Sequence, residues 1–519
     1  MPEHNHQLTS VKTIFLETFG CQMNDLDSEL ISGQLSSIGY ELMDDRDSAD
    51  IVLFNTCSVR EQAENKVLSR IGELGVEKRE GRKVIVGMIG CLPEREGSGL
   101  LGKYPQIDFL CGPSELDKLP MLVNNAIVGF FGMNTDRVAL QGNNSRRSAA
   151  LSAAEDNLEL LDLSRAFDPD GGNRSSAFVR ITRGCNKFCT YCVVPNTRGA
   201  EVHRPPDAIV EECRELAESG VVEVTLLGQT VNHYRYTHGM AISHDGREVS
   251  QVGPSLKVFS QDDTDIQQVT TFAKLLQRIH DEVPEIARLR FVTSYPKDFG
   301  DDILETMRDC DRICNYLHVP AQSGSNRILK LMNRGYTVEE YLEFIDRART
   351  IIPDVEIAGD IIVGFPTETE DDYEATRTLL KKVRYKNNFV FHYSPRPGTV
   401  AIDRFEDDIS RDVKRRRLNA ILELGSEISS EVHGSYEGKE VEIFVERVSP
   451  KSSKRNSVEL RWETQEVQMT GRTAGDLICV FNIPEQTDPE KYIGKKVVVS
   501  ITESGPLLLS GTFCGFSCQ

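Results

Sequence analysis

The chain has 519 residues, and because domains average about 150 residues, about three domains are expected rather than one small core. Hydrophobic residues make up 39% and charged residues 27% of the sequence, which excludes a disordered or fibrous protein. The formal net charge of −20 excludes attraction to nucleic acid or to an anionic membrane by overall charge, so any phosphate contact must come from a local patch.

The sequence contains no candidate membrane segment, since no stretch approaches about 18 consecutive apolar residues. Its first ten residues, MPEHNHQLTS, lack the apolar region of a signal peptide, so we expect a cytoplasmic protein. The 13 cysteines are an odd number spread over the whole chain, unlike the disulfide framework of a small secreted domain. Metal or redox chemistry is the better interpretation of these thiols.

The first predicted domain covers residues 12–128 and alternates strands with amphipathic helices that start near Asp25 and Arg60. The predicted strands are Thr13–Thr18, Ile51–Phe54 and Lys83–Met88. Such alternation predicts an open parallel sheet in an α/β domain.

A cysteine follows each of these three strands, at nearly equal intervals along the chain: Cys21, Cys57 and Cys91. Each interval is about the length of one βαβ unit. Because the carboxyl ends of parallel strands meet at one edge of a sheet, the three thiols are predicted to converge on one site.

The second predicted domain follows a linker at 142–176 that is rich in Asn, Ser, Asp and Gly. It covers residues 177–430 and again alternates strands with helices. Its predicted strands are Ala177–Thr182, Val222–Leu227, Arg288–Ser294, Tyr316–Val319, Val355–Val363 and Phe389–Tyr393. Five or six such strands favour a complete or partial (β/α) barrel whose active face is formed by the carboxyl ends of the strands. The polar stretch 233–268 is predicted to be an exposed insertion.

The third predicted domain, residues 432–512, consists of short runs rich in β-branched residues and is expected to be a small all-β barrel. The predicted strands are Lys439–Val445, Val467–Thr470, Leu477–Phe481 and Lys496–Thr502. Concentrated positive charge occurs in the run Lys414–Arg417 and in a loop with Lys451, Lys454 and Arg455, which are candidates for nucleic-acid contacts. Cys514 and Cys518 are interpreted as part of a flexible tail.

The sharpest motif is RGCNKFCTYCVVPNTRG, which places Cys185, Cys189 and Cys192 in a C-x3-C-x2-C array directly after a predicted strand. Thiolates this close can hold an iron-sulfur cluster, which normally has four cysteine ligands. A cluster with three ligands keeps one iron open, as chelation of a small molecule by its amino and carboxylate groups requires. A structural zinc site is the alternative, but it needs a fourth ligand and the nearest histidine, His203, lies outside the loop.

At this array the sequence resembles the radical S-adenosylmethionine superfamily. The resemblance implies that the three cysteines hold a 4Fe-4S cluster, that S-adenosylmethionine occupies the open iron, and that an electron from the cluster cleaves it to a 5'-deoxyadenosyl radical. Residues near later strand ends are the candidates for contacts with this cofactor: Gly228, Gln229, Gln322, Ser323 and Gly364.

The two cysteine sets together resemble the methylthiotransferases, radical enzymes with two clusters. Further matches are FLETFGCQMN, NTCSVRE, HVPAQSGSNRILKLMNRGYT, DIIVGFPTETEDD and FHYSPRPGT. The resemblance implies a second 4Fe-4S cluster on Cys21, Cys57 and Cys91, and an RNA-binding TRAM domain at the C-terminus. It also implies a monomer that uses tRNA, an external one-electron reductant and a sulfur source.

Within this family, SVRE after Cys57 favours the branch that methylthiolates N(6)-dimethylallyladenosine beside the anticodon of tRNA. Carbon 2 of adenine is neither acidic nor electrophilic, so a radical suits the reaction better than acid-base catalysis. The alternatives are methylthiolation of threonylcarbamoyl-adenosine or of a ribosomal-protein aspartate. A further alternative is an iron-sulfur protein that binds RNA and only carries electrons. The three-cysteine loops argue against it, because an electron-transfer cluster gains from complete ligation by the protein.

The remaining candidates are weaker. Cys213, Cys310, Cys314 and Cys479 are expected to be structural, while Cys111 follows an apolar stretch and is a neighbour of the N-terminal thiols at most. The histidines of the polar stretch, which are His233, His238 and His244, offer metal ligands, but polar loops also collect histidines by chance.

Overall fold

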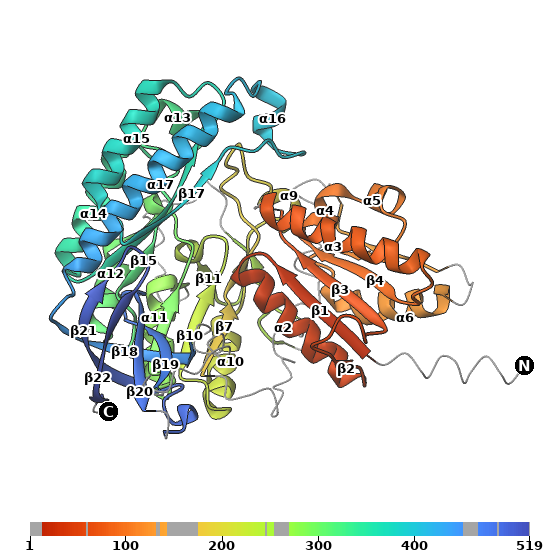
Figure 1. The fold of residues 1–519 in the computed structure, drawn as a ribbon, viewed down its shortest axis with the longest axis horizontal. Helices are drawn as coiled ribbons and strands as arrows, with labels where there is room; N and C mark the ends of the chain where they lie inside the picture. Colours follow the sequence, from red (N-terminus) through yellow and green to blue (C-terminus); the bar gives the residue numbers. More distant parts are fainter. Residues whose placement is uncertain are drawn as a thin grey trace, which may run out of the picture.

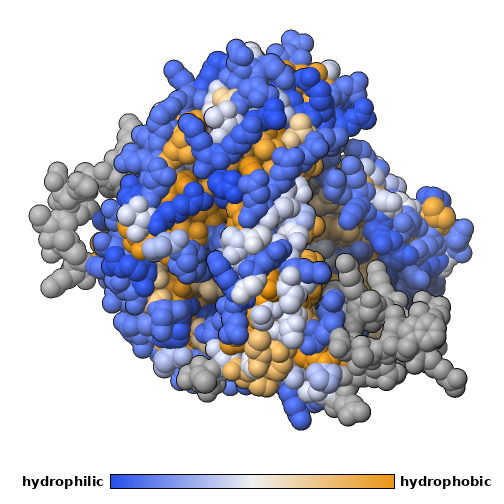
Figure 2. Space-filling view, turned by 60° about the vertical axis from the view of Figure 1, so that its left-hand side comes forward, coloured by the Kyte–Doolittle hydropathy of each residue, from blue (hydrophilic) through white to orange (hydrophobic). Residues whose placement is uncertain are grey.

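A computed structural model describes residues 13–58, 61–130, 135–142, 175–243, 246–253, 269–449, 466–484 and 487–517. It contains an N-terminal α/β part, a central core and a C-terminal barrel (Figure 1). The face in Figure 2 is mostly hydrophilic, with apolar side chains gathered in patches. Within the described ranges, no helix is both long and apolar enough to cross a membrane.

The N-terminal part is a parallel sheet of six strands in the order β2-β1-β3-β4-β5-β6. The strands are β1 Thr13–Phe19, β2 Glu41–Leu42, β3 Ile51–Thr56, β4 Ile85–Gly90, β5 Phe109–Cys111 and β6 Val138–Ala139. The helices are α2 Gln22–Ser37, α3 Glu61–Arg79, α4 Cys91–Glu96, α5 Gly99–Lys103 and α6 Leu119–Phe130. Every residue of β3 and β4 is buried, as expected for central parallel strands covered on both faces. The predicted parallel sheet is confirmed.

The central core contains two parallel sheets of three strands, in the orders β14-β10-β7 and β15-β16-β17. The first sheet comprises β7 Ser176–Arg180, β10 Glu223–Leu227 and β14 Arg288–Phe291, and the second β15 Tyr316–His318, β16 Glu356–Val363 and β17 Asn387–His392. A parallel bridge between Leu289 and Ile313 connects the first sheet to the segment that enters β15. These six strands form the partial barrel predicted from the alternating pattern.

Helices cover the outside of the partial barrel and bury one large apolar core against it. The longer ones are α10 Pro206–Glu218, α11 Phe272–Glu282, α12 Asp301–Asp309, α14 Val338–Ile351, α15 Glu370–Val383 and α17 Arg411–Gly434. The short ones are α9 Val194–Thr197, α13 Asn326–Leu331 and α16 Val400–Arg404. Short strands β8 Thr182–Arg183 and β9 Val202–His203 flank the C-x3-C-x2-C loop.

The predicted insertion differs from the structure at its start. Tyr234 and Tyr236 are 2% and 0% exposed and belong to the central core. They lie in and beside β11 (Arg235–Thr237), which pairs with β13 (Val269–Thr271), while β12 (Gln251–Val252) pairs with β9. The two tyrosines alternate with polar residues, so the segment reads as polar although one of its faces is buried. Residues 254–268 of this stretch lie outside the described ranges.

The C-terminal part is a closed barrel in the order β18-β19-β20-β22-β21. Its strands are β18 Glu440–Val448, β19 Glu466–Arg472, β20 Ile478–Pro484, β21 Lys496–Ser504 and β22 Leu509–Phe516. The predicted all-β module is therefore confirmed. The prediction of a flexible tail around Cys514 is wrong, because this residue lies in β22, where Phe513 packs against the barrel core. Cys518 lies outside the described residues.

Candidate functional site

The first thiol set lies where three neighbouring strands end. Cys21 precedes α2 after β1, Cys57 directly follows β3, and Cys91 is the first residue of α4 after β4. The backbones come close together here, because Gly90 has a φ of +96° and a Cβ on it would lie 2.5 Å from the carbonyl oxygen of Thr56. Only glycine fits this turn, which brings Cys91 back to the edge of the sheet.

The three thiols influence one another. A hydrogen bond with Cys57 and the nearby positive charge of Arg198 lower the pKa of Cys21 to about 5, against the effect of burial. Burial raises the pKa of Cys91, while Arg198 opposes the rise and the charge of Cys21 adds to it. Cys57 and Cys91 are 2% and 5% exposed, whereas Cys21 is open to solvent. The structure thus brings together the three thiols that the strand spacing predicted to converge.

The second thiol set lies in the loop between β8 and α9. This loop starts at Gly184, whose φ is +70° and whose Cβ would lie 2.0 Å from the carbonyl oxygen of Ala200. The sulfur of Cys185 accepts a hydrogen bond from the Lys187 amide at 3.4 Å and lies 3.8 Å from the Thr230 hydroxyl. The sulfur of Cys189 accepts from the Arg334 guanidinium at 3.4 Å.

The surroundings of these thiols raise the pKa of two of them. Burial, followed by the charge of Glu201, raises the pKa of Cys185 to about 11. Burial and then the charges of Cys189 and Cys185 raise the pKa of Cys192. Burial therefore favours the neutral thiols of Cys185 and Cys192, and the positive charge of iron would stabilise their thiolates. The donor set therefore fits a cluster with three protein ligands.

Arg198 joins the two thiol sets, a role that was not predicted from its sequence motif. It extends from the end of α9, and its Nη2 donates to Oδ2 of Asp27 on α2 at 2.7 Å. Arg180 on β7 lies 3.5 Å from the other oxygen of Asp27. The side chains of Arg198, Asp27 and Arg180 are 7%, 1% and 2% exposed. This buried ion-pair network fixes the C-x3-C-x2-C loop between β8 and α9, called the radical loop below, against the first thiol set.

A second network joins the same two parts through Glu64 on α3. Its Oε1 accepts from Nη1 of Arg95 at 2.7 Å and from Nη1 of Arg396 at 2.8 Å. Arg396 lies in the loop after β17, and in the same loop the carbonyl of Gly398 accepts from the Asn196 amide at 2.6 Å. The loop after β17 therefore contacts both thiol-bearing parts.

The predicted cofactor residues divide into two groups. Neighbouring protein atoms require glycine at two of these positions. A Cβ on Gly228 would lie 2.3 Å from the Thr182 hydroxyl, and a Cβ on Gly364 would lie 2.5 Å from Cγ of Lys414. Ser323 is buried and accepts from the Ser325 amide at 3.2 Å. In contrast, the side-chain oxygens of Gln229 and Gln322 are buried without a hydrogen-bond partner.

Glu201 adds a third such acceptor, because its Oε2 is also buried and unpartnered. Buried acceptors without partners are rare and usually receive a ligand or a water. S-adenosylmethionine carries an ammonium group and ribose hydroxyls as donors, so these three oxygens fit that cofactor.

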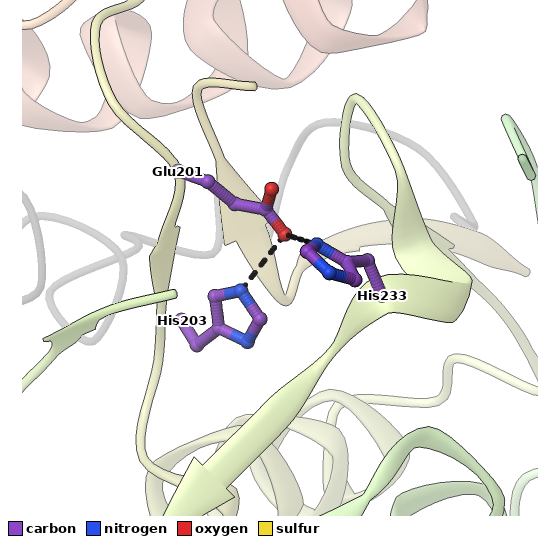
Figure 3. Close-up of side chains that lie close together, drawn as sticks. All are labelled: Glu201, His203 and His233. Atoms are coloured by element: carbon purple, nitrogen blue, oxygen red, sulfur yellow. Dashed lines mark hydrogen bonds and ion pairs between the residues drawn. The ribbon is translucent and has the colours of Figure 1, made fainter. Parts of the chain in front are cut away.

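Glu201, His203 and His233 form a buried group whose ligand atoms lie within 4.8 Å of one another (Figure 3). Oε1 of Glu201 lies 2.9 Å from Nε2 of His203 and 2.5 Å from Nδ1 of His233. The Arg235 amide donates to Nδ1 of His203 at 2.8 Å, so the proton of this ring is on Nε2. A metal on Nε2 would require a ring without any proton, and we therefore interpret the group as a hydrogen-bonded network.

The network keeps Glu201 ionised beside the radical loop. Burial alone would raise the pKa of Glu201, but the hydrogen bonds with His203 and His233 lower it to about 2. The second predicted histidine, His238, bonds instead to Glu248 and Thr270, at 3.1 and 2.9 Å. His244 lies outside the described residues.

The remaining cysteines have protein surroundings. The Cys111 thiol donates to the carbonyl of Glu115 at 3.2 Å, and burial raises its pKa well above the usual value. The other buried cysteines are Cys213, Cys310, Cys314 and Cys479. These positions agree with the structural roles expected for them.

Comparisons with known proteins agree with this geometry. Residues 179–380 match the radical SAM superfamily, and residues 13–112 match the uncharacterized protein family UPF0004. The chain is 39% identical over 483 residues to a tRNA-2-methylthio-N(6)-dimethylallyladenosine synthase of Rhodopirellula baltica, covering 92% of this chain and 91% of the relative. It is 40% identical over 441 residues to the protein of that name from Protochlamydia amoebophila, covering 85% and 86%.

A solved structure of the radical S-adenosylmethionine methyltransferase TsrM from Kitasatospora setae, with cobalamin and a [4Fe-4S] cluster bound, aligns with a TM-score of 0.46. The two chains are 15% identical, and the alignment covers 75% of this chain and 77% of the other.

Proposed function

This chain belongs to the tRNA-2-methylthio-N(6)-dimethylallyladenosine synthase family, and from that premise we propose that it methylthiolates N(6)-dimethylallyladenosine beside the anticodon of tRNA. The observation that carries the proposal is the presence of two sets of three thiols, one at the edge of the N-terminal sheet and one in the loop between β8 and α9, joined through Arg198 and Asp27. One radical source alone would need only one set. The names of the relatives favour this substrate over threonylcarbamoyl-adenosine, a ribosomal-protein aspartate or simple electron transfer.

Each thiol set holds one cluster in this proposal. Cys185, Cys189 and Cys192 hold the 4Fe-4S cluster that binds S-adenosylmethionine, and Cys21, Cys57 and Cys91 hold a second 4Fe-4S cluster. When bound, these groups would supply a carbon-centred radical and a methyl group, and the second cluster would present the sulfur that an external source provides. The unpartnered oxygens of Gln229, Gln322 and Glu201 would accept hydrogen bonds from S-adenosylmethionine.

The surrounding side chains position the sulfurs and adjust their charge. Arg334 donates to the sulfur of Cys189 and stacks over the ring of Tyr295 with 4.7 Å between the guanidinium carbon and the ring centroid. The positive charge of Arg198 favours the thiolates of Cys21 and Cys91. Hydrogen bonds and charges of this kind tune the reduction potential of iron-sulfur clusters. The buried setting also excludes water from reactive intermediates.

The supply of electrons and sulfur must come from outside the chain in this proposal. We propose an external one-electron reductant and an external sulfur source, because a radical cycle consumes an electron and a methylthiolation consumes a sulfur atom. A cytoplasmic monomer suits this role, since tRNA and small reducing proteins are available there.

Selection for the dimethylallyl group tests the proposed function. The reconstituted protein, given S-adenosylmethionine and a reductant without oxygen, is expected to methylthiolate dimethylallylated tRNA much faster than unmodified tRNA. The physical reason is that an apolar substituent gains free energy by leaving water for a pocket. Mass spectrometry of the digested nucleosides measures the product. Equal rates on the two tRNAs would contradict the proposal.

The run Lys414–Arg417 contributes less exposed charge than its sequence suggests. Arg417 is buried against Glu368 and Glu370, and Lys414 against Asp407. Only Arg415 and Arg416 are exposed, with 73% and 64% of their side-chain surface accessible. The loop with Lys451, Lys454 and Arg455 lies outside the described residues.

Replacing Arg415 and Arg416 with glutamine is expected to weaken tRNA binding and flatten its salt dependence. Each lost phosphate contact reduces the slope of log affinity against log salt by about one. Fluorescence anisotropy at several salt concentrations measures the slope, with Arg308→Gln as the control on another exposed arginine. A slope equal to that of the wild type would place the tRNA on a different surface.

A further inference from the structure

Two phenylalanines of the partial barrel are exposed on one face of its edge strand. Phe389 and Phe391 on β17 are 42% and 37% exposed. In the described part of the chain, Phe516 of the C-terminal barrel is the one other phenylalanine with a comparable exposure. Val390 between them packs against the apolar core on the opposite side, the side covered by α17. The two rings therefore point toward the inside of the partial barrel.

The neighbouring strands extend this face. In the parallel pairing of β16 with β17, Asp360 is opposite Phe389 and Ile362 is opposite Phe391, so the four side chains share one face. His318 on β15 joins them, because its Nε2 lies 3.2 Å from Oδ1 of Asp360. Its ring also meets that of Phe389 edge-on, with 5.9 Å between the centroids. An apolar wall thus lies beside a pair of polar groups.

This wall adjoins the radical loop. Ile362 packs against a small apolar cluster that also contacts Tyr191, the residue directly before Cys192. The loop that follows Phe391 on β17 bonds to Asn196 of the radical part and to Glu64 of the N-terminal part. A molecule on the wall would therefore lie near the C-x3-C-x2-C loop and near the loop after β17, which contacts both thiol-bearing parts.

We propose that Phe389 and Phe391 bind the modified adenine, with Phe389 against the purine ring and Phe391, together with Ile362, against its dimethylallyl group. The His318–Asp360 pair would hydrogen-bond to an edge of the same base. The inference rests on the proposed function and adds the residues that select the substrate. The chemistry matches, because bases bind on aromatic side chains and an apolar substituent binds on an apolar wall.

The experiment measures binding of two anticodon stem-loops to the full-length protein, one with the dimethylallyl group and one without. Fluorescence anisotropy gives both dissociation constants, and their ratio is the preference of the protein for the modified base. We expect Phe389→Ala to weaken binding of both RNAs by about tenfold, since stacking of one base is typically worth this much or more. Phe389→Trp, which keeps an aromatic ring, should restore binding.

Phe391→Ala is expected to act differently, reducing the preference for the modified RNA while the unmodified RNA binds nearly as before. Leu422→Ala is the matched control, because this side chain is 45% exposed but lies on α17, the helix behind the sheet. A wild-type protein without any preference would contradict the proposed function itself. If Phe391→Ala kept the full preference of the wild type for the modified RNA, the present inference would be overturned while the proposed function would stand. Binding of a protein partner, and not of RNA, to this wall would overturn the inference in the same way.

Discussion

Replacing Cys185, Cys189 and Cys192 together with serine should abolish the reductive cleavage of S-adenosylmethionine. The three thiols lie in the loop between β8 and α9, and a serine hydroxyl binds iron far more weakly than a thiolate does. Release of 5'-deoxyadenosine under reducing conditions, measured by chromatography, follows the cleavage. Iron analysis of the same variant should still give about four iron atoms per chain, from the cluster at the other thiol set.

The matched variant replaces Cys21, Cys57 and Cys91 with serine. It should also retain about four iron atoms per chain and should still cleave S-adenosylmethionine, but form no methylthiolated tRNA. The two variants therefore lose different halves of the reaction. Formation of 5'-deoxyadenosine by the first variant, or of methylthiolated product by the second, would refute the assignment of the two clusters.

The convergence of the N-terminal thiols was predictable from sequence because it depends on local patterns. The strands Ile51–Thr56 and Ile85–Gly90 are short apolar runs, and parallel order follows from the helix between them. Once the strands are parallel neighbours, a cysteine that follows each of them must lie at the same edge. The C-x3-C-x2-C motif is even more local, since all three thiols lie in one short loop.

The long-range contacts at the two sites were not predictable in this way. Arg198 and Asp27 are 171 residues apart, Arg334 and Cys189 are 145 apart, and Arg396 and Glu64 are 332 apart. An arginine that pairs inside the protein has the same local sequence signal as one on the surface. The run Lys414–Arg417 illustrates this limit, since its four neighbouring cations divide evenly into buried and exposed ones.

Arg198→Met should destabilise the contact between the N-terminal part and the central core strongly. The substitution leaves the carboxylate of Asp27, which is 1% exposed, with Arg180 at 3.5 Å as its remaining ion-pair neighbour. Removing one partner of a buried ion pair typically costs about 3–5 kcal/mol, because the other charge stays buried without compensation. Thermal unfolding followed by circular dichroism should show a large decrease in the midpoint temperature of the first unfolding transition. Arg415→Met, which removes an exposed arginine, is the control and should have little effect.

The double variant Arg198→Met with Asp27→Asn separates the loss of the ion pair from the loss of packing. Removing both charges should recover part of the stability, because no carboxylate is then buried without Arg198. The recovery should be partial, since Arg180 also loses the Asp27 carboxylate as a neighbour. The double variant should not recover iron at the first thiol set, because Arg198 also balances the negative charge of Cys21 and Cys91. Adding Asp27→Asn to Arg198→Met would then raise the stability without raising the iron content. If both recovered together, Arg198 would act on the thiols only by holding the two parts in contact.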